Sequence, residues 1–356
     1  HRTEYCAPLC SVDHPPPAWC PAAAKDGPVR IGIVVTNIRS IDGTWTTSHL
    51  ADAALKAGAT VRFLEPQDFE VTSNGRLVAR AWAVDEPMDS VASLAAALSS
   101  HRLPRQYLDI STCTMLLLRV NPLQWHTLQC VTLASNAGVA VINDPLGVSL
   151  TRGKAWLATL QDVPTPKTVV TASRSSALAF ARHMGGRIVV KPATGSGGRG
   201  VTLVPASRSD LLDRAFTIAR NQGGLAVVQE YMPEAELGEK RLVWTGGELI
   251  GGYLRQRAPG NFRHNLKQGA SPVACEITDQ DRALSAAIGP HLLRNGIGIA
   301  GLDVIGGRLV EVNTLNPGGI HWADALTSQP PGMLAKRAID RLLHTAAEFR
   351  KRTISR

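Results

Sequence analysis

The chain has 356 residues, of which 44% are hydrophobic and 19% are charged, the composition of a folded globular protein rather than a disordered one. Its formal net charge of +9 favours anionic partners but does not choose among nucleic acids, nucleotides and small carboxylates. Apolar runs such as Met115–Leu118 are far shorter than the roughly 20 residues that span a bilayer, and no apolar run follows a basic N-terminal start. We therefore expect neither a membrane-spanning segment nor a signal peptide.

Residues 1–28 are predicted to form a loose N-terminal arm. Cysteines and prolines are concentrated there, namely Cys6, Cys10, Cys20, Pro15–Pro17 and Pro21. A zinc knuckle favours a Cys-x-x-Cys pair, and the arm has none. We interpret the arm as a tail rather than a metal site.

Residues 29–145 alternate strands and helices in the way that is typical of an open α/β sheet. Val29–Val35 is a continuous apolar run, as expected for a buried parallel strand, and the helix that follows ends at Gly58. Strands are predicted at 29–35, 60–64, 114–119 and 139–142, and helices at 48–57, 91–98 and 123–137.

Two further modules are predicted after the first domain. Residues 146–233 form a small α/β module with helices at 152–160, 175–184 and 210–221 and strands at 168–170, 187–191, 201–204 and 225–229. Residues 234–356 mix strands and helices and end in a short basic tail, which we expect to be solvated from Arg350 onward. The predicted fold class is α/β, in part α+β.

A glycine-rich loop, Lys191-Pro-Ala-Thr-Gly-Ser-Gly-Gly-Arg-Gly200, lies between two of these strands. It contains the G-x-G-x-x-G pattern of dinucleotide-binding turns, but such a turn opens a helix, and Val201–Pro205 does not favour one. A P-loop would close with Gly-Lys-Ser/Thr, and a protein kinase carries its lysine on the following strand. The pattern favours a flap whose backbone N–H groups cover phosphates beside Lys191, with a plain flexible hairpin as the alternative.

Residues 300–313 predict a β-hairpin that turns at Gly306-Gly307-Arg308. With a three-residue loop, Ile305 would pair with Leu309, Asp303 with Glu311, and Gly301 with Asn313. Because side chains alternate along a strand, Asp303, Glu311 and Asn313 would then share one face. The other face would bury Leu302, Val304, Val310 and Val312.

Two carboxylates that face each other on a sheet repel, and a divalent cation between them removes that cost. Two acids and an amide are oxygen ligands that suit Mg²⁺, or Mn²⁺ in its place, held in part by phosphate oxygens. With a two-residue turn, Asp303 and Glu311 would instead lie on opposite faces and form no site. The residues by themselves leave both turns open.

Five segments, in their order and spacing, resemble the ATP-grasp ligases, and prokaryotic glutathione synthetase most of all. They are Lys191-Pro192 with its flap, Gln229–Pro233, Gly238–Arg241, Gly301–Asp303 and Glu311–Asn313. The resemblance runs from about Arg30 to Leu343. It implies an ATP-grasp fold preceded by an N-terminal open-sheet α/β domain, with ATP between the small module and the C-terminal catalytic module.

The resemblance implies an ATP site with Lys154 and Lys191 on adenine and phosphates, the backbone of 229–232 on adenine, and Glu239 on the ribose. The expected ATP-binding residues are Lys154, Lys191, Gly195, Ser196, Gly197, Gly198, Gln229, Glu230, Tyr231, Met232 and Glu239. It also implies Asp303, Glu311 and Asn313 as ligands of Mg²⁺, in agreement with the hairpin.

The resemblance further implies Arg241, Lys191 and Arg263 as catalytic residues. The expected substrate-binding residues are Arg119, Arg241, Arg257, Arg263, Asn265, Asn313, Pro317, Gly318 and Gly319. Arg255 is the alternative to Arg257 as the arginine of a substrate loop that closes over the site.

Two segments depart from the family pattern. Arg119-Val-Asn-Pro122 stands where glutathione synthetase has Arg-Lys-Asp-Pro, and Asn316–His321 replaces a Ser-Pro-Thr-Cys-like stretch. The loss of one lysine and one aspartate near the substrate weakens the case for the same dipeptide substrate.

The function implied by the resemblance is an ATP-dependent ligase that joins amino acids or a small peptide by an amide bond through an acyl phosphate, acting in specialised metabolism. Glutathione synthetase itself, joining γ-glutamylcysteine to glycine, is the alternative. A non-catalytic nucleotide-binding module is a more distant one, and the intact lysines and acids argue against it.

The expected partners are small carboxylate and amine substrates. A nucleic-acid partner is disfavoured because aromatic residues make up only 5% of the chain and do not alternate with basic ones. No membrane partner is expected. The resemblance implies a cytoplasmic homo-oligomer, a dimer or a tetramer.

Overall fold

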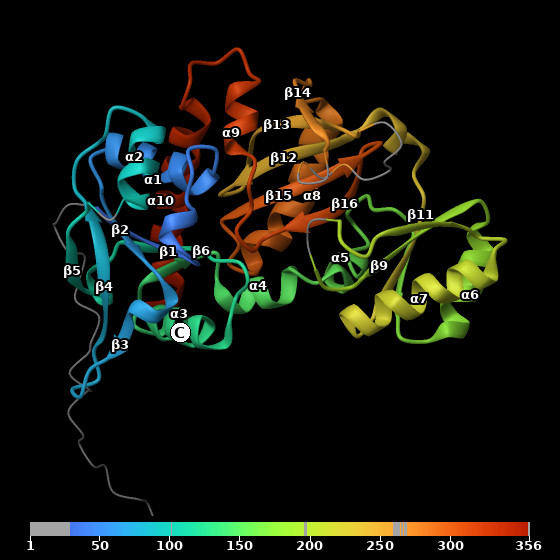
Figure 1. Cartoon of the computed structure of the whole chain (residues 1–356), viewed down its shortest axis with the longest axis horizontal. Helices are drawn as coiled ribbons and strands as arrows, with labels where there is room; N and C mark the ends of the chain where they lie inside the picture. Colours follow the sequence, from blue (N-terminus) through green and yellow to red (C-terminus); the bar gives the residue numbers. More distant parts are fainter. Residues whose placement is uncertain are drawn as a thin grey trace, which may run out of the picture.

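A computed structural model describes residues 29–100, 102–195, 198–258, 264, 266 and 269–354. The predicted arm, residues 1–28 with Cys6, Cys10 and Cys20, lies outside the described residues. Three sheets follow one another along the chain, within residues 30–142, 168–230 and 239–313 (Figure 1). Each sheet lies within one of the three predicted modules, whose exact boundaries stay a prediction. In the part of the chain that is described, no helix is long and apolar enough to cross a membrane.

The first sheet has the strand order β3-β4-β2-β1-β6-β7, with β5 paired to β4. Its parallel centre, β1, β2, β6 and β7, was predicted, whereas the antiparallel extension of β3, β4 and β5 was not. The strands are β1 (Arg30–Val35), β2 (Thr60–Leu64), β3 (Phe69–Val71), β4 (Leu77–Val84), β5 (Arg105–Asp109), β6 (Met115–Arg119) and β7 (Ala140–Ile142). The helices are α1 (Thr46–Lys56), α2 (Val91–Ser99) and α3 (Trp125–Asn136), with 3₁₀ turns at η1 (Ile38–Ser40), η2 (Pro66–Asp68) and η3 (Ile110–Thr112).

The connection to the second sheet is broken into two short helices, where the sequence predicted a single helix at 152–160. Asp144 caps the first of them by accepting a hydrogen bond from the Gly147 N–H at 2.7 Å, and Pro145 occupies its first turn. The two helices are α4 (Pro145–Thr151) and α5 (Lys154–Ala158).

The second sheet is antiparallel, in the order β10-β9-β11-β8, and the glycine-rich loop joins β9 to β10. Its elements are β8 (Thr168–Thr171), α6 (Arg174–Met184), β9 (Arg187–Pro192), β10 (Thr202–Pro205), α7 (Ser209–Gly223) and β11 (Ala226–Glu230). The apolar sides of α6 and α7 pack on this sheet. The loop therefore lies in an antiparallel hairpin, as predicted for a flap and unlike a dinucleotide-binding turn.

The third sheet has the order β14-β13-β12-β15-β16 and carries most of the candidate site. Its elements are η4 (Pro233–Leu237), β12 (Glu239–Thr245), β13 (Glu248–Gln256), β14 (Ser271–Val273), α8 (Asp279–Arg294), β15 (Ile299–Ile305), β16 (Arg308–Asn313), α9 (Ile320–Ala325) and α10 (Met333–Ile354). The helix α8 covers one face of the sheet through Leu284, Ile288 and Leu292. On the opposite face, Val243, Ile250 and Tyr253 pack against α9 and α10, and the polar side chains of the site occupy another part of that face.

The hairpin of β15 and β16 has the shorter of the two turns that the sequence left open, but the strand pairing expected for the longer one. Its turn has two residues, Gly306 and Gly307. Ile305 therefore pairs with Arg308, whereas the three-residue loop predicted a pair with Leu309. A β-bulge then shifts the register, and Asp303 pairs with Glu311 as expected. The two carboxylates therefore face each other, although the turn is the one that would have separated them.

The bulge also changes the face on which Val310 lies, although the residue is buried as predicted. Leu309 takes the core position beside Leu302 and Val304, and Val310 lies with Ile305 and Met232 in a separate apolar cluster. A bulge adds one residue to one strand, so the alternation of faces is interrupted at that point. Val310 thus joins the face that carries the site rather than the core.

The C-terminal helix α10 returns to the first domain, where it packs beside α1 (Figure 1). Arg350, which we expected to be solvated, is half-buried there, and its Nη2 donates a hydrogen bond to the Cys113 carbonyl oxygen at 2.6 Å. Burial lowers the pKa of Arg350. The end of α10 is therefore a structural part of the first domain at this residue.

Asn143 joins the first sheet to the third. Its Nδ2 donates to the carbonyl oxygens of Ile299 and Thr314, both at 2.7 Å, and its Oδ1 accepts from the N–H groups of Gly298 and Ile299 at 2.8 and 2.9 Å. The side chain is buried, at 2% exposure, and its polar capacity is filled. It fixes the ends of β15 and β16 against β7.

Replacing Asn143 by Leu should lower the free energy of unfolding by about 4 kcal/mol, because two carbonyls and two N–H groups lose their partner in a buried site. Urea unfolding followed by circular dichroism measures this loss. Asn136→Leu, at an exposed position of α3, is the matched control and should change stability by less than about 1 kcal/mol. Equal midpoints for the two variants would contradict the bridging role of Asn143.

Candidate active site

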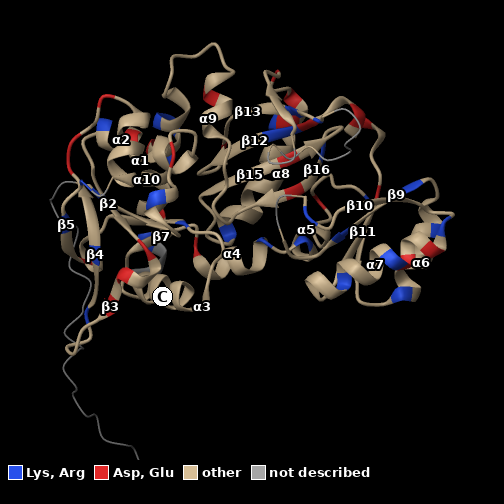
Figure 2. Ribbon diagram, viewed as in Figure 1, with Lys and Arg blue, Asp and Glu red and all other residues tan. Residues whose placement is uncertain are grey.

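A pocket lies between the second and third sheets and brings most of the predicted residues together. Its wall combines β9 and β11 with β12, β13, β15 and β16. Figure 2 shows that basic and acidic positions both occur on the strands of the third sheet. One end of the pocket is polar and the other is apolar. The lining comprises Val189, Lys191, Gly198, Val201, Gln229–Met232, Ala235, Glu239, Arg241, Arg255, His264, Asp303, Ile305, Val310, Glu311 and Asn313.

Two lysines stand at the base of the glycine flap. Lys191, on β9, is 7% exposed and donates from Nζ to the Gln229 Oε1 at 3.1 Å. Lys154 donates to the carbonyl oxygen of Gly195 at 3.2 Å. Burial lowers the pKa of Lys191, and the nearby Lys154 adds to this effect. A phosphate placed between the lysines would relieve the repulsion.

The flap itself contributes Gly198 to the pocket wall. Gly195, Gly198 and Gly200 have φ values of 118°, 70° and 71°, which residues with a side chain rarely adopt. The backbone of the flap therefore requires glycine at these three positions. The predicted ATP contacts Ser196 and Gly197 lie outside the described residues.

Asp303 is the buried centre of the polar end. Arg241 donates two hydrogen bonds to the carboxylate of Asp303, from Nε to Oδ1 at 2.6 Å and from Nη2 to Oδ2 at 3.1 Å. The Arg255 Nη1 lies 3.3 Å from Oδ1, and the Asn313 Nδ2 donates to Oδ2 at 3.0 Å. Arg241 and Arg255 outweigh burial and hold the pKa of Asp303 below its usual value.

Glu311 faces Asp303 across the hairpin and lies 3.7 Å from the Lys154 Nζ. Unlike Asp303, Glu311 accepts no hydrogen bond from an arginine of the described residues, so its oxygens remain available to a ligand. Across the described residues, no three acidic, histidine or cysteine side chains gather to bind a metal. A divalent cation here would therefore rely on Glu311, Asp303 and the amide of Asn313, an oxygen set that fits Mg²⁺ together with phosphate.

Glu239 is buried beside Asp303, and this burial, followed by the repulsion from Asp303, raises its pKa to about 7. Its Oε1 accepts a hydrogen bond from Arg255 at 2.8 Å. Arg255 thus bridges two carboxylates, and their attraction raises its pKa. With Lys154, Lys191 and Arg241, the polar end holds four cations against three acids, which suits a polyanionic ligand.

The apolar end forms a slot of the kind that holds a flat ring. Met232, Ala235, Ile305 and Val310 form one buried cluster, with Tyr231 packed against it. Val189 completes the wall from β9. The predicted backbone segment 229–232 lines this end, so a purine in the slot could reach its polar backbone atoms.

The loop Pro317–Gly319 binds two of the predicted substrate residues, Arg241 and Arg119. Arg241 Nη1 donates to the Gly318 carbonyl oxygen at 3.0 Å, and Arg119 Nη2 donates to that of Pro317 at 2.9 Å. Arg119 is 4% exposed, and burial lowers its pKa to about 9. Its Nη1 has no hydrogen-bond partner among the described residues, so one buried donor is left for a ligand.

The structure separates the two candidate loop arginines. Arg255 lies in the pocket on Glu239 and Asp303, whereas Arg257 pairs with Glu236 outside the pocket lining. Arg263 and Asn265 lie outside the described residues. A substrate role for Arg257 stays a prediction.

Sequence reasoning missed several residues of this pocket. Ile305 and Val310 were assigned no binding role because the bulge that turns Val310 toward the pocket leaves no mark in the local pattern. His264 is 6% exposed, and its Nε2 lies 2.7 Å from the carbonyl oxygen of Ala235. Only its contact with η4 shows His264 to be buried.

The chain matches two family models. Residues 29–149 match the N-terminal domain of prokaryotic glutathione synthetase, and residues 154–328 match the ATP-grasp domain of the same family. The matched segments contain the flap, the carboxylate hairpin and the Arg119 region.

Similar proteins of known name agree with these matches. A glutathione synthetase of Thermosynechococcus vestitus is 30% identical over 315 residues, 83% of this chain and 95% of the relative, and one of Coxiella burnetii is 28% identical over 306 residues, 83% and 92%. A D-cycloserine synthetase structure aligns with a TM-score of 0.61 at 18% identity, covering 89% of this chain and 99% of its own. The D-alanine-D-alanine ligase of Coxiella burnetii aligns with a TM-score of 0.58 at 10% identity, over 92% and 97%. The two structures share the fold.

Glu239→Gln should remove a pH-dependent loss of stability. A carboxyl group whose pKa is raised in the folded state favours folding below its unfolded value of about 4.5, and this contribution is lost as the pH rises through about 7. Between pH 5 and pH 8 the variant should gain about 2 kcal/mol on the unmodified protein, measured by urea unfolding at both pH values.

Glu236→Gln is the matched control for this comparison. The hydrogen bond from Tyr231, followed by the charge of Arg257, lowers the pKa of Glu236, so it does not titrate in this range. A Glu239→Gln variant whose stability follows the same pH course as the unmodified protein would contradict the assignment.

Proposed function

Because the chain belongs to the prokaryotic glutathione synthetase family, it is an ATP-dependent ligase that forms amide bonds, and we propose that it joins an amino acid or small peptide to an amine through an acyl phosphate. The observation that carries the proposal is the pairing of Asp303 with Glu311 opposite the lysines of the flap. This arrangement has a place for phosphates and a place for the cation that accompanies them.

We propose that the first step transfers the γ-phosphoryl group of ATP to a substrate carboxylate, giving the acyl phosphate and ADP. The adenine would lie in the slot of Met232, Ile305 and Val310, with the phosphates between Lys154 and Lys191. Because phosphoryl transfer needs positioning and charge neutralisation rather than a protein nucleophile, these cations supply what the step requires.

The second step is the attack of the amine on the acyl carbonyl, which expels phosphate and releases one proton from the nitrogen. The Arg241 guanidinium lies between Asp303 and the Pro317–Gly319 loop, where it could stabilise the oxyanion of the tetrahedral intermediate. Arg119 offers its unpartnered Nη1 to a substrate carboxylate. Closure of the flap would exclude water from the acyl phosphate.

The enzyme uses a divalent metal with ATP, and we propose that it is Mg²⁺, held by Glu311, Asp303 and Asn313. When bound, the cation neutralises phosphate charge and orients the nucleotide. Arg241 and Asn313 fix the orientation of the Asp303 carboxylate, and Lys154 keeps Glu311 near the phosphates.

The carboxylate substrate is proposed to differ from γ-glutamylcysteine. Of the two departures at 120–121, Val120 is fully buried in the core of the first domain, so its side chain is turned away from ligand. Asn121 is exposed, and its backbone N–H donates to Thr36 Oγ1 at 2.9 Å. A neutral amide there removes one negative charge that an amino group of the substrate could use. Glutathione synthesis is the second candidate, favoured by the names of the similar proteins.

We propose that the enzyme works in the cytoplasm, where ATP is supplied, as a homo-oligomer of two or four chains. Exposed apolar side chains on α3 and α4 support the association, since Trp125 and Leu150 are 75% and 54% exposed.

Glu311→Gln should lower the rate of ADP release at least about 100-fold, because the neutral amide cannot hold a divalent cation against the phosphates. A coupled ADP assay with saturating substrates measures the change. Glu70→Gln, at an exposed position of β3, is the control and should retain full activity. Unchanged turnover of Glu311→Gln would sink the metal assignment.

A matrix of carboxylate and amine substrates in the same assay tests the substrate proposal. We expect γ-glutamylcysteine with glycine to give no amide, and another amino-acid or dipeptide pair to give product, which mass spectrometry identifies. Asn121→Asp should then raise the use of γ-glutamylcysteine, because it restores the family charge. Efficient glutathione formation by the unmodified enzyme would instead establish the second candidate.

A further inference from the structure

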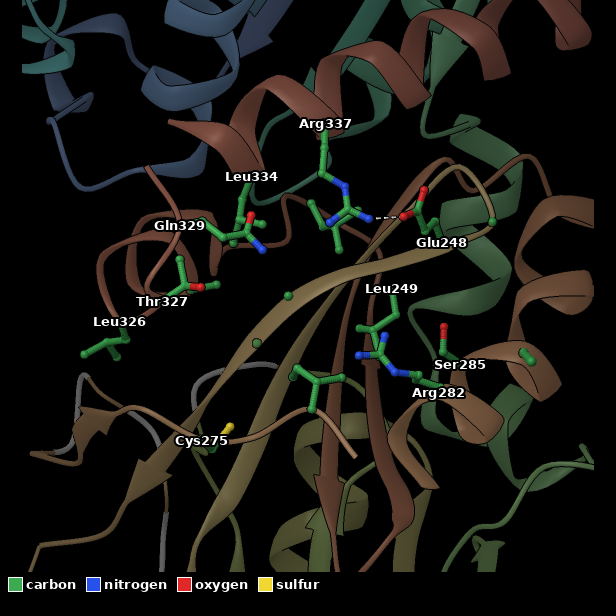
Figure 3. A pocket seen from close by; sticks show the side chains of 17 residues that line it. Glu248, Leu249, Cys275, Arg282, Ser285, Leu326, Thr327, Gln329, Leu334 and Arg337 are labelled. Atoms are coloured by element: carbon green, nitrogen blue, oxygen red, sulfur yellow. Dashed lines mark hydrogen bonds and ion pairs between the residues drawn. The ribbon is translucent and has the colours of Figure 1, made fainter. Parts of the chain in front are cut away.

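A second pocket of about 400 Å³ lies at the edge of the third sheet and shares no lining residue with the ATP pocket. Its floor is Gly247 with the first half of β13, residues 248–252, and its walls come from α8 and from α9, α10 and the segment between them (Figure 3). No predicted site residue lies there. Its size is that of a typical ligand pocket.

The floor of this pocket is an open strand edge. β14 pairs only with Leu254–Gln256 of β13, so in the described part of the chain no strand covers that side of residues 248–252. Outward backbone N–H and C=O groups of an uncovered edge are available to pair with another extended chain. An incoming strand would continue along β13 in line with β14.

The walls add an unpaired positive charge. Arg282 extends from α8 toward β13 in Figure 3, and no hydrogen bond or ion pair joins its side chain to a described residue. Arg337, on α10, is paired with Glu248 at the end of the strand, and Arg341 also lies 3.5 Å from that carboxylate. The lining therefore holds a positive charge that is free to meet an acidic group.

Ser285 contributes a polar group to the α8 wall. The residue is 4% exposed and lines the pocket, and no hydrogen bond joins its hydroxyl to a described residue. Leu249, Ile277 and Leu334 add apolar surface to the lining, which suits the alternating side chains of an extended chain.

We propose that this pocket binds an extended acidic peptide segment of another protein by adding it as a strand to the open edge of β13. Backbone pairing along 248–252 would give the affinity, and an acidic side chain meeting Arg282 would give the selectivity. A small free anion would use Arg282 but not the strand edge, which is why the peptide is the better fit. This inference does not depend on which amide the enzyme forms.

The test uses the full chain and a peptide labelled at its N-terminus, fluorescein-Thr-Val-Asp-Val-Thr-amide. We expect saturable binding by fluorescence anisotropy and slower amide hydrogen exchange at 248–252. Arg282→Glu should weaken binding at least about tenfold, while Arg294→Glu, an exposed arginine of the same helix outside the pocket, should leave it unchanged. Both variants should retain ligase activity, which shows that they fold.

Two further probes distinguish binding of a paired strand from binding of a simple anion. A peptide methylated on its central backbone nitrogens should lose binding, and N-acetylaspartate should compete only weakly. The proposal is overturned by binding that is insensitive to Arg282→Glu or to methylation, by N-acetylaspartate competing as well as the peptide, or by the absence of any anisotropy change up to about 1 mM peptide.

Discussion

The carboxylate of Asp303 is the group around which the active site is arranged. It lies 5% exposed between Arg241, Arg255 and Asn313, and the pairing of β12 with β15 sets Arg241 directly opposite it. Buried charges are tolerated only when they are paired, so each member fixes the position of the others. Arg255 links this carboxylate to Glu239, and Arg241 links it to the carbonyl oxygen of Gly318.

The Pro317–Gly319 loop connects Arg241 to the first domain through hydrogen bonds. Its carbonyl oxygens bind Arg241 on one side and Arg119 on the other, and the N–H of Gly319 donates to Thr46 Oγ1 at 3.1 Å. Asn143 and the returning helix α10 hold the same two parts of the chain together. The first domain is therefore a wall of the proposed substrate site, although none of its residues lines the pocket between the second and third sheets.

The sequence by itself determined the features that depend on local order along the chain. The glycines around Lys191 predicted a flap because only glycine accepts the backbone angles that it needs, and the period-2 pattern of 300–313 predicted which acids share a face. The parallel strands of the first sheet were evident because strands buried on both faces are continuously apolar. From residue 234 onward, the sequence predicted one hairpin within a mixed pattern and left β12, β13 and β14 unassigned.

Only the tertiary structure decided the features that depend on contacts between distant segments. The bulge at Val310 restored the pairing of Asp303 with Glu311 and turned an apolar side chain toward the pocket, because neighbouring strands and not the turn set the register. Arg255 lies in the pocket because the pairing of β12 with β13 sets it opposite Glu239. The open edge of β13 exists because β14 covers only part of that strand, a property of pairing length that no residue pattern records.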